Sequence, residues 1–195
     1  MNALAKSNMG YVLAPPQNMP TAPIGSTFEL SGRIAKKNNV VIDFDSLTQV
    51  IGVDSQIPSD AINVFSELLD IIKAMLVSNF DEKVLFYELI SNHLVDIGQN
   101  PLEVLRNHKY EKNLESIFSG ILENDISNYS MHFSSPLDTT DDVNWHDIQI
   151  QPSRRADKFF SVVTVYRKSK KQKVDKFVEN MEENLRKIFD ILKTK

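Results

Sequence analysis

The chain has 195 residues, with 22 lysines and arginines against 26 aspartates and glutamates, and 42% of its residues are apolar. These values are those of an ordinary globular protein and exclude a collagen-like, disulfide-stapled or wholly disordered chain. Because cysteine is absent, a thiol nucleophile, a zinc ribbon, an iron–sulfur cluster and a structural disulfide are excluded as well. Any metal site would have to be built from histidines and carboxylates.

The N-terminus lacks the continuous apolar stretch of a secretory signal, since Lys6, Ser7 and Asn8 interrupt it. The most apolar stretch, residues 61–77, contains charged residues and is shorter than the ~20 apolar residues that a membrane span requires. The sequence therefore predicts a cytoplasmic protein without a membrane partner, and we expect no cofactor.

Charge is distributed unevenly along the chain. Residues 1–150 contain 9 basic and 20 acidic residues, a net charge of −11, whereas residues 151–195 contain 13 and 6, a net charge of +7. Such asymmetry indicates either a basic surface for an anionic partner or neutralisation between elements that pack together. The sequence leaves both interpretations open.

The N-terminal part is predicted to be an arm followed by a β-hairpin. Residues 1–25 contain four of the eight prolines and few periodic apolar residues, which predicts an irregular arm. From Phe28 to Ile34, and again from Val40 to Phe44, apolar and polar residues alternate on either side of a polar turn. This pattern predicts a hairpin with one buried face, followed by a third short strand at 49–53.

Helical spacing of apolar residues follows the predicted hairpin. A wide apolar arc predicts a buried helix over 61–77. A second helix is expected over 81–98, because Leu85 and Leu89 keep helical spacing and the stretch ends on a glycine, a common residue just after a helix. A further helix is expected to begin at Pro101.

The C-terminal part is predicted to contain three strands, at 129–134, 144–150 and 159–167, and then a long helix over 171–192. Strands are thus grouped rather than alternating with helices. Grouping predicts an α+β fold, in which helices cover an antiparallel sheet made of the N-terminal hairpin and the three-strand C-terminal meander. We expect the arm to be followed by a single domain over 26–195.

One histidine pair is a candidate for catalysis, although most catalytic signatures are absent and the sequence favours a non-enzyme over an enzyme. If the strands at 129–134 and 144–150 form a hairpin about Thr139, His132 lies directly opposite His146, near enough to share a metal. A metal-dependent hydrolase is therefore one alternative. Two sheet histidines without a metal are the favoured interpretation. The loop would supply further ligands from Asp138, Asp141 and Asp142.

Basic residues of the 154–176 region are candidates for binding nucleic acid. They precede and follow the expected strand at 159–167, so they should form two patches roughly 30 Å apart. Lysine and arginine bind phosphates with release of counterions, but a solvated turn and helix start are the favoured interpretation. The candidate residues are Arg154, Arg155, Arg167, Lys168, Lys170, Lys171 and Lys173.

The predicted terminal helix carries an apolar stripe spaced 4-3-4-3-4 along the chain. Such a stripe suits a partner helix, and it suits the core of the same chain equally well. Packing within the chain is the favoured interpretation. The residues of this stripe, which are the candidate interaction residues, are Val174, Val178, Met181, Leu185, Ile188 and Leu192.

Taken together, these patterns predict a non-enzymatic protein-interaction or binding module. We expect a protein partner, most simply a second copy in a homo-oligomer formed through the terminal helix, an edge strand or the N-terminal arm. The first alternative is a nucleic-acid-associated protein that uses the basic 154–176 region. The second is the hydrolase with a metal at His132 and His146.

Overall fold

The structure is a computed structural model that describes residues 4, 8–14, 31–76, 79–107, 119–121, 123, 129–136 and 143–193. The chain divides into two compact units, Met1–Lys83 (unit 1) and Val84–Lys195 (unit 2). The expected single domain over 26–195 stays a prediction. Each unit combines helices with an antiparallel sheet, so the expected α+β class is confirmed, with two sheets in place of one.

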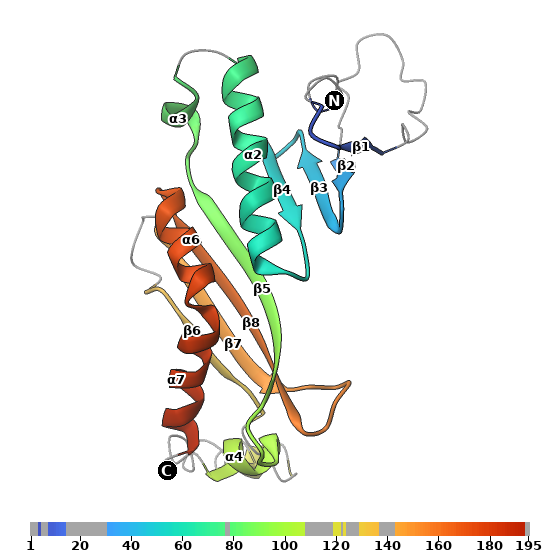
Figure 1. The fold of residues 1–195 in the computed structure, drawn as a ribbon. Helices are drawn as coiled ribbons and strands as arrows, with labels where there is room; N and C mark the ends of the chain where they lie inside the picture. Colours follow the sequence, from blue (N-terminus) through green and yellow to red (C-terminus); the bar gives the residue numbers. More distant parts are fainter. Residues whose placement is uncertain are drawn as a thin grey trace. The chain divides into compact units, whose positions relative to one another are not determined.

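Unit 1 is a four-stranded antiparallel sheet with a helix on one face (Figure 1). The expected hairpin and third strand are confirmed as β2, β3 and β4, which lie side by side in that order, and Phe28 lies outside the described residues. The elements of unit 1 are β1 (Val12–Leu13), β2 (Ser31–Lys37), β3 (Val40–Asp45), β4 (Val50–Asp54), α2 (Pro58–Leu76) and α3 (Phe80–Lys83).

The core of unit 1 forms between its sheet and α2. Ile42 of β3 and Leu68 of α2 are almost completely buried, and Ala35 of β2 lies opposite Ile42. Leu4, from the expected N-terminal arm, is buried in the same cluster, and β1 of that arm pairs with β2. These parts of the arm therefore pack as part of unit 1.

An ion pair joins β2 to α2 at the edge of this core. Lys37 Nζ lies 2.5 Å from Oε1 and 2.6 Å from Oε2 of Glu67, and both side chains are largely shielded from solvent. Burial acts most strongly on the pKa of Glu67 and raises it, but the hydrogen bonds and charge of Lys37, together with the nearby Tyr11 hydroxyl, outweigh burial and hold that pKa below its usual value. Burial and the nearby Glu67 charge together raise the pKa of Tyr11, whose ring lies 5.2 Å from Lys37 Nζ.

Unit 2 is a second four-stranded antiparallel sheet, in the order β5-β8-β7-β6 (Figure 1). Strands β6, β7 and β8 correspond to the three strands expected from the sequence. No helix within the described ranges of the chain is long and apolar enough to span a membrane. The elements of unit 2 are β5 (Tyr87–Asp96), α4 (Pro101–Asn107), β6 (Met131–Ser134), β7 (His146–Pro152), β8 (Phe159–Lys168), α6 (Lys171–Glu179) and α7 (Met181–Lys193).

Helices α6 and α7 cover one face of this sheet, which we name the inner face. Phe160 of β8 packs against Phe189 of α7, with ring centroids 5.1 Å apart. Tyr166, six residues along the same strand, stacks on Phe177 of α6 at 4.0 Å. Since Phe160 and Tyr166 lie on the same side of β8, the two contacts place both helices on one face and form the core of unit 2.

The helix expected over 81–98 is wrong, because this stretch forms the short helix α3 and then the ten-residue strand β5. Leu85 and Leu89 do keep helical spacing, but residues 87–96 also alternate between half-buried and exposed positions. Every residue of β5 pairs with the strongly β-forming strand β8. Gly98 does take a left-handed conformation, with φ of 71°, in the turn that follows the strand.

The long C-terminal helix is confirmed and consists of two segments that meet at Asn180. The Asn180 side-chain amide donates a hydrogen bond to the Lys176 carbonyl, at 2.6 Å. The same Lys176 carbonyl accepts the Asn180 backbone N–H at 3.2 Å, so two donors share one acceptor where the two segments meet.

We expect Glu67→Gln to lower the free energy of unfolding by about 1 kcal/mol at neutral pH, because Lys37 loses a shielded, charged partner. The folded-state pKa of Glu67 lies below its usual value of 4.5. The stabilisation is therefore complete above that pH and is lost as the pH falls through the folded-state pKa. Urea unfolding of the full chain, followed by circular dichroism at several pH values, measures both effects.

Asp81→Asn is the matched control in the same unit, because it removes an exposed partner of Lys73, at 2.8 Å. We expect the control to cost less than Glu67→Gln. Equal losses in the two variants would contradict the stabilising role assigned to the Lys37–Glu67 pair.

Candidate interaction surface

The second face of the unit 2 sheet, which we name the outer face, lies opposite the one that α6 and α7 cover. Strand registers define its members, because residues directly opposite on paired strands point to the same side. No described helix of unit 2 packs on this face. The outer face consists of Glu88, Ile90, Asn92, Leu94 and Asp96 of β5; Phe159, Ser161, Val163, Val165 and Arg167 of β8; Asp147, Gln149 and Gln151 of β7; and His132 and Ser134 of β6.

Two large apolar side chains of β5 are exposed on the outer face. Ile90 is 69% exposed and Leu94 is 58% exposed. Val165 lies next to Ile90 and Val163 next to Asn92 on the neighbouring strand, and both valines are half-buried. Exposed apolar residues that adjoin one another, rather than being scattered singly, commonly mark an interaction site.

One arginine, Arg167, occupies one end of the outer face together with a carboxylate and two aromatic rings. Arg167 Nη2 lies 2.7 Å from Glu88 Oε2, and the guanidinium carbon lies 4.1 Å from the Phe86 ring centroid and 5.7 Å from that of Trp145. The two rings and the carboxylate account for much of this arginine's surroundings. Arg167, a candidate phosphate-binding residue, is therefore engaged within its own unit.

The other basic candidates lie where the sequence placed them, near the two ends of β8. Arg154 and Arg155 are exposed in the turn before this strand. After it, Lys168 lies over the ring of Tyr166, 5.1 Å from the centroid. Lys171 is paired with Asp175 at 2.6 Å, while Lys170 and Lys173 are exposed. The seven candidates therefore do not converge on one site.

The expected pairing of His132 with His146 is wrong. His132 lies opposite Gln149, so the true register differs from the expected one by three residues. Because the shift is odd, the two histidines lie on different faces of the sheet. The three acidic loop residues lie outside the described residues. Within the described ones, no group of three or more metal-binding side chains occurs.

Each histidine instead has a local partner. His132 Nε2 lies 2.5 Å from Asp147 Oδ1 on the outer face. His146 Nδ1 lies 2.9 Å from Ser135 Oγ, and the Ser135 hydroxyl oxygen also accepts a hydrogen bond from the backbone N–H of His146, at 3.0 Å. These contacts hold β6 to β7 and leave the two imidazoles without a shared ligand position.

The apolar stripe of the terminal helix faces the unit's own sheet. Met181 and Leu185 are buried in the core of unit 2, and Ile188 and Leu192 pack against it. Val174 is also buried and Val178 is half-buried. The structure thus shows the packing within the chain that the sequence favoured, while two large apolar side chains of β5 are exposed. The role of these six residues in binding a partner stays a prediction.

Three buried polar atoms near β5 have no hydrogen-bond partner within the described structure. They are Ser91 Oγ, His93 Nε2 and Thr164 Oγ1. Ser91 lies opposite Thr164 on the inner face, and His93 is two residues further along β5 on that face. Burial lowers the pKa of His93. The sequence analysis missed this cluster, because it placed residue 93 on a helix.

Comparisons with protein-family models, with curated proteins and with solved structures found no match for this chain. The two components of the candidate surface are the exposed apolar residues on the outer face of β5 and the unpartnered polar atoms on the inner face of the same strand.

We expect Thr164→Val to raise the free energy of unfolding by about 1 kcal/mol, because it replaces a buried, unpartnered hydroxyl with a methyl group of similar size. The matched control is the reverse change, two residues away on the same face of β8. Val162→Thr, at a fully buried position of the same strand, should destabilise the protein by roughly 1–3 kcal/mol. Urea unfolding measures both variants. A loss of stability in Thr164→Val would contradict the absence of a hydrogen-bond partner for the Thr164 hydroxyl.

The lowered pKa of His93 predicts a dependence of stability on pH. The unfolded chain takes up a proton near the usual pKa of 6.5, above the folded-state value. The contribution of His93 to the free energy of unfolding should therefore be complete above pH 6.5 and be lost as the pH drops toward the folded-state pKa. His93→Gln should remove this part of the slope in urea unfolding, whereas His132→Gln, at an exposed position, should retain it. An unchanged slope in His93→Gln would refute the prediction.

Proposed function

We propose that this chain is a non-enzymatic protein-interaction module that binds a protein partner on the outer face of β5. The observation that carries the proposal is the exposure of Ile90 and Leu94, at 69% and 58%, on one face of a single ten-residue strand. Burying such side chains against a partner removes apolar surface from water, which is the main driving force of association. In this proposal the protein acts in the cytoplasm.

Specificity in such an interface would come from the polar groups that surround the two apolar residues. Asn92 lies between Ile90 and Leu94 and accepts a hydrogen bond from Ser161 Oγ, at 3.3 Å. Arg167 and Glu88 form their ion pair at one end of the strand. An apolar centre with a polar rim is the usual composition of a protein interface.

The two alternatives have less support. The hydrolase was based on a facing histidine pair, and the observed register separates His132 from His146. The nucleic-acid alternative stays a prediction. Among its residues, Arg167 and Lys171 are paired with carboxylates inside unit 2, at 2.7 and 2.6 Å, whereas binding of phosphates requires cations that face the ligand.

Simultaneous Ile90→Asp and Leu94→Asp substitutions in the full chain should strongly weaken partner binding, since they place charges at the centre of the proposed interface. The wild-type chain serves as bait in extract from the source cells, and a captured protein is then purified for measurement of Kd. We expect Kd to rise roughly a hundredfold in the double variant, because central residues carry most interface energy.

The matched control is Ile191→Asp, which places the same charge at an exposed isoleucine of α7 in the same unit. This control should bind like the wild type. A double variant that retains the wild-type Kd would contradict the proposed function. Circular dichroism of each variant checks that its fold is unchanged.

A further inference from the structure

We propose that the partner bound by β5 is a second copy of this chain. In the proposed dimer, two β5 strands pair antiparallel about a twofold axis at Asn92 and join two four-stranded sheets into one sheet of eight strands. The inference rests on the proposed function and deepens it, because it names the partner and the residues that meet.

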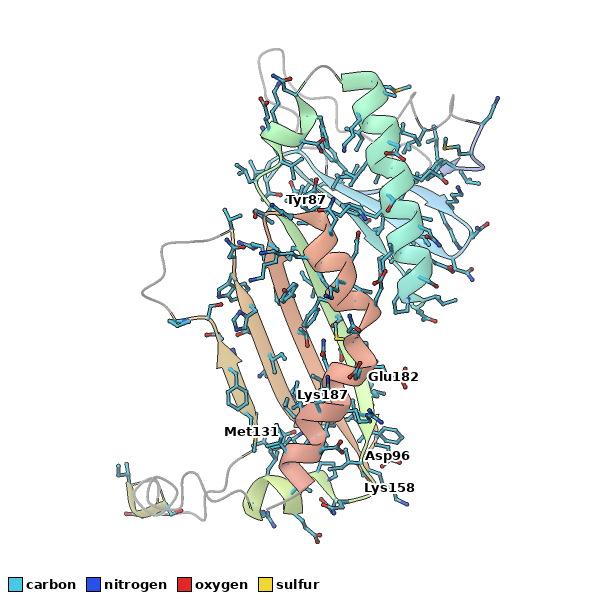
Figure 2. The ribbon with its side chains drawn as sticks, turned by 60° about the vertical axis from the view of Figure 1, so that its left-hand side comes forward. Tyr87, Asp96, Met131, Lys158, Glu182 and Lys187 are labelled. Atoms are coloured by element: carbon cyan, nitrogen blue, oxygen red, sulfur yellow. The ribbon has the colours of Figure 1, made fainter. Side chains whose placement is uncertain are left out.

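The outer edge of β5 is suited to strand pairing. Within the described part of the chain, β5 pairs only with β8, along all ten residues and without a bulge. Natural edge strands are usually protected from pairing by a lysine, a proline, a bulge or a short length. The sequence of β5, YELISNHLVD, has neither lysine nor proline. Figure 2 shows this strand running from Tyr87 to Asp96.

Only one register pairs both exposed apolar residues of each copy with exposed apolar residues of the other. Since opposite residues of antiparallel strands share a face, a twofold axis must pass midway between the two copies of one residue of β5. With the axis at Asn92, Ile90 of each copy lies opposite Leu94 of the other. An axis at Ser91 would place Ile90 opposite Asn92. An axis at His93 would place Ile90 opposite Asp96.

The same register matches two polar groups of the inner face, which are shielded from solvent in the single chain and would have to turn toward the edge of β5 to meet. An axis at Asn92 places Ser91 of each copy opposite His93 of the other. Ser91 Oγ and His93 Nε2 are two of the buried atoms that have no partner within the described structure. A serine hydroxyl donates and a neutral imidazole nitrogen accepts, so each copy supplies what the other lacks. Leu89 and Val95 also face each other in this register.

One pair in this register is unfavourable, since Glu88 of each copy lies opposite Asp96 of the other. Both positions are at the ends of the strand. Arg167 already lies 2.7 Å from Glu88 and offsets its charge, and Asp96 Oδ1 accepts a hydrogen bond from the Gly98 backbone N–H at 2.8 Å. The end pairs oppose this register, but the four central pairs favour it. Two of these pairs are polar, Asn92 with Asn92 and Ser91 with His93, and two are apolar, Ile90 with Leu94 and Leu89 with Val95.

A cysteine placed at the proposed axis tests the pairing, because the chain has no cysteine of its own. In the full chain, Asn92→Cys should form an intermolecular disulfide under mild oxidation, since opposite residues have Cβ atoms roughly 4.5–5.5 Å apart, close to disulfide geometry. Gln149→Cys is the matched control. Gln149 lies in the same row and on the same face as Asn92, two strands from it, and should stay unlinked.

The register has its own test. Chains carrying Ile90→Cys, labelled with ¹⁵N, are mixed with unlabelled chains carrying Leu94→Cys. Mass spectrometry should find mixed disulfide dimers, whereas each variant alone should link no more than Gln149→Cys does. Native mass spectrometry of the untagged wild type should show a dimer, whose Kd rises at least tenfold with Ile90→Asp and Leu94→Asp but not with Ile191→Asp.

A wild-type chain that stays monomeric at its highest soluble concentration overturns the inference. So does a dimer in which Asn92→Cys links no faster than Gln149→Cys. Neither result touches the proposed function, which fails separately if a captured partner binds the Ile90→Asp and Leu94→Asp variant with the wild-type Kd.

Discussion

The pairing of β5 with β8 is the constraint on which the rest of unit 2 depends. All ten residues of β5 are in register with β8, and this ladder separates the side chains of β5 into an inner and an outer set. The inner set, with Phe160 and Val162 of β8, forms the apolar surface against which α6 and α7 pack. The outer set is exposed as a direct consequence, and with it the apolar residues Ile90 and Leu94.

The centre of β5 inverts the pattern that a sheet covered on one face should have. A half-buried strand is expected to direct apolar residues inward and polar residues outward. Here Ser91 and His93 point to the inner face while Ile90 and Leu94 point to the outer one. A conflict between local pattern and burial commonly marks a functional position. In the proposed dimer, each Ile90 would lie beside Leu94 of the other copy, and each Ser91 beside its His93.

The basic C-terminal segment is balanced in part within its own unit. Arg167 is paired with Glu88, 79 residues earlier in the sequence, and Lys171 with Asp175 one helical turn away. Of the two interpretations that uneven charge permits, neutralisation between packed elements accounts for Arg167, whereas Lys171 is neutralised within its own helix. Net charge along a sequence is thus a weak guide to a binding surface, because folding brings distant charges together.

The sequence by itself determined the elements whose periodicity has one solution: the β2–β3 hairpin, the aromatic strand β8 and the terminal helix with its apolar stripe, whereas the structure decided that this stripe faces inward. Only the tertiary structure decided β5, because Leu85 and Leu89 fit a helix as well as residues 87–96 fit a strand, and pairing with β8 selected the strand. It also decided the partners of His132 and His146, since the loop between their strands does not fix a register. Local periodicity depends on residues that are close in the sequence, whereas register and exposure depend on which sequence-distant strand pairs alongside.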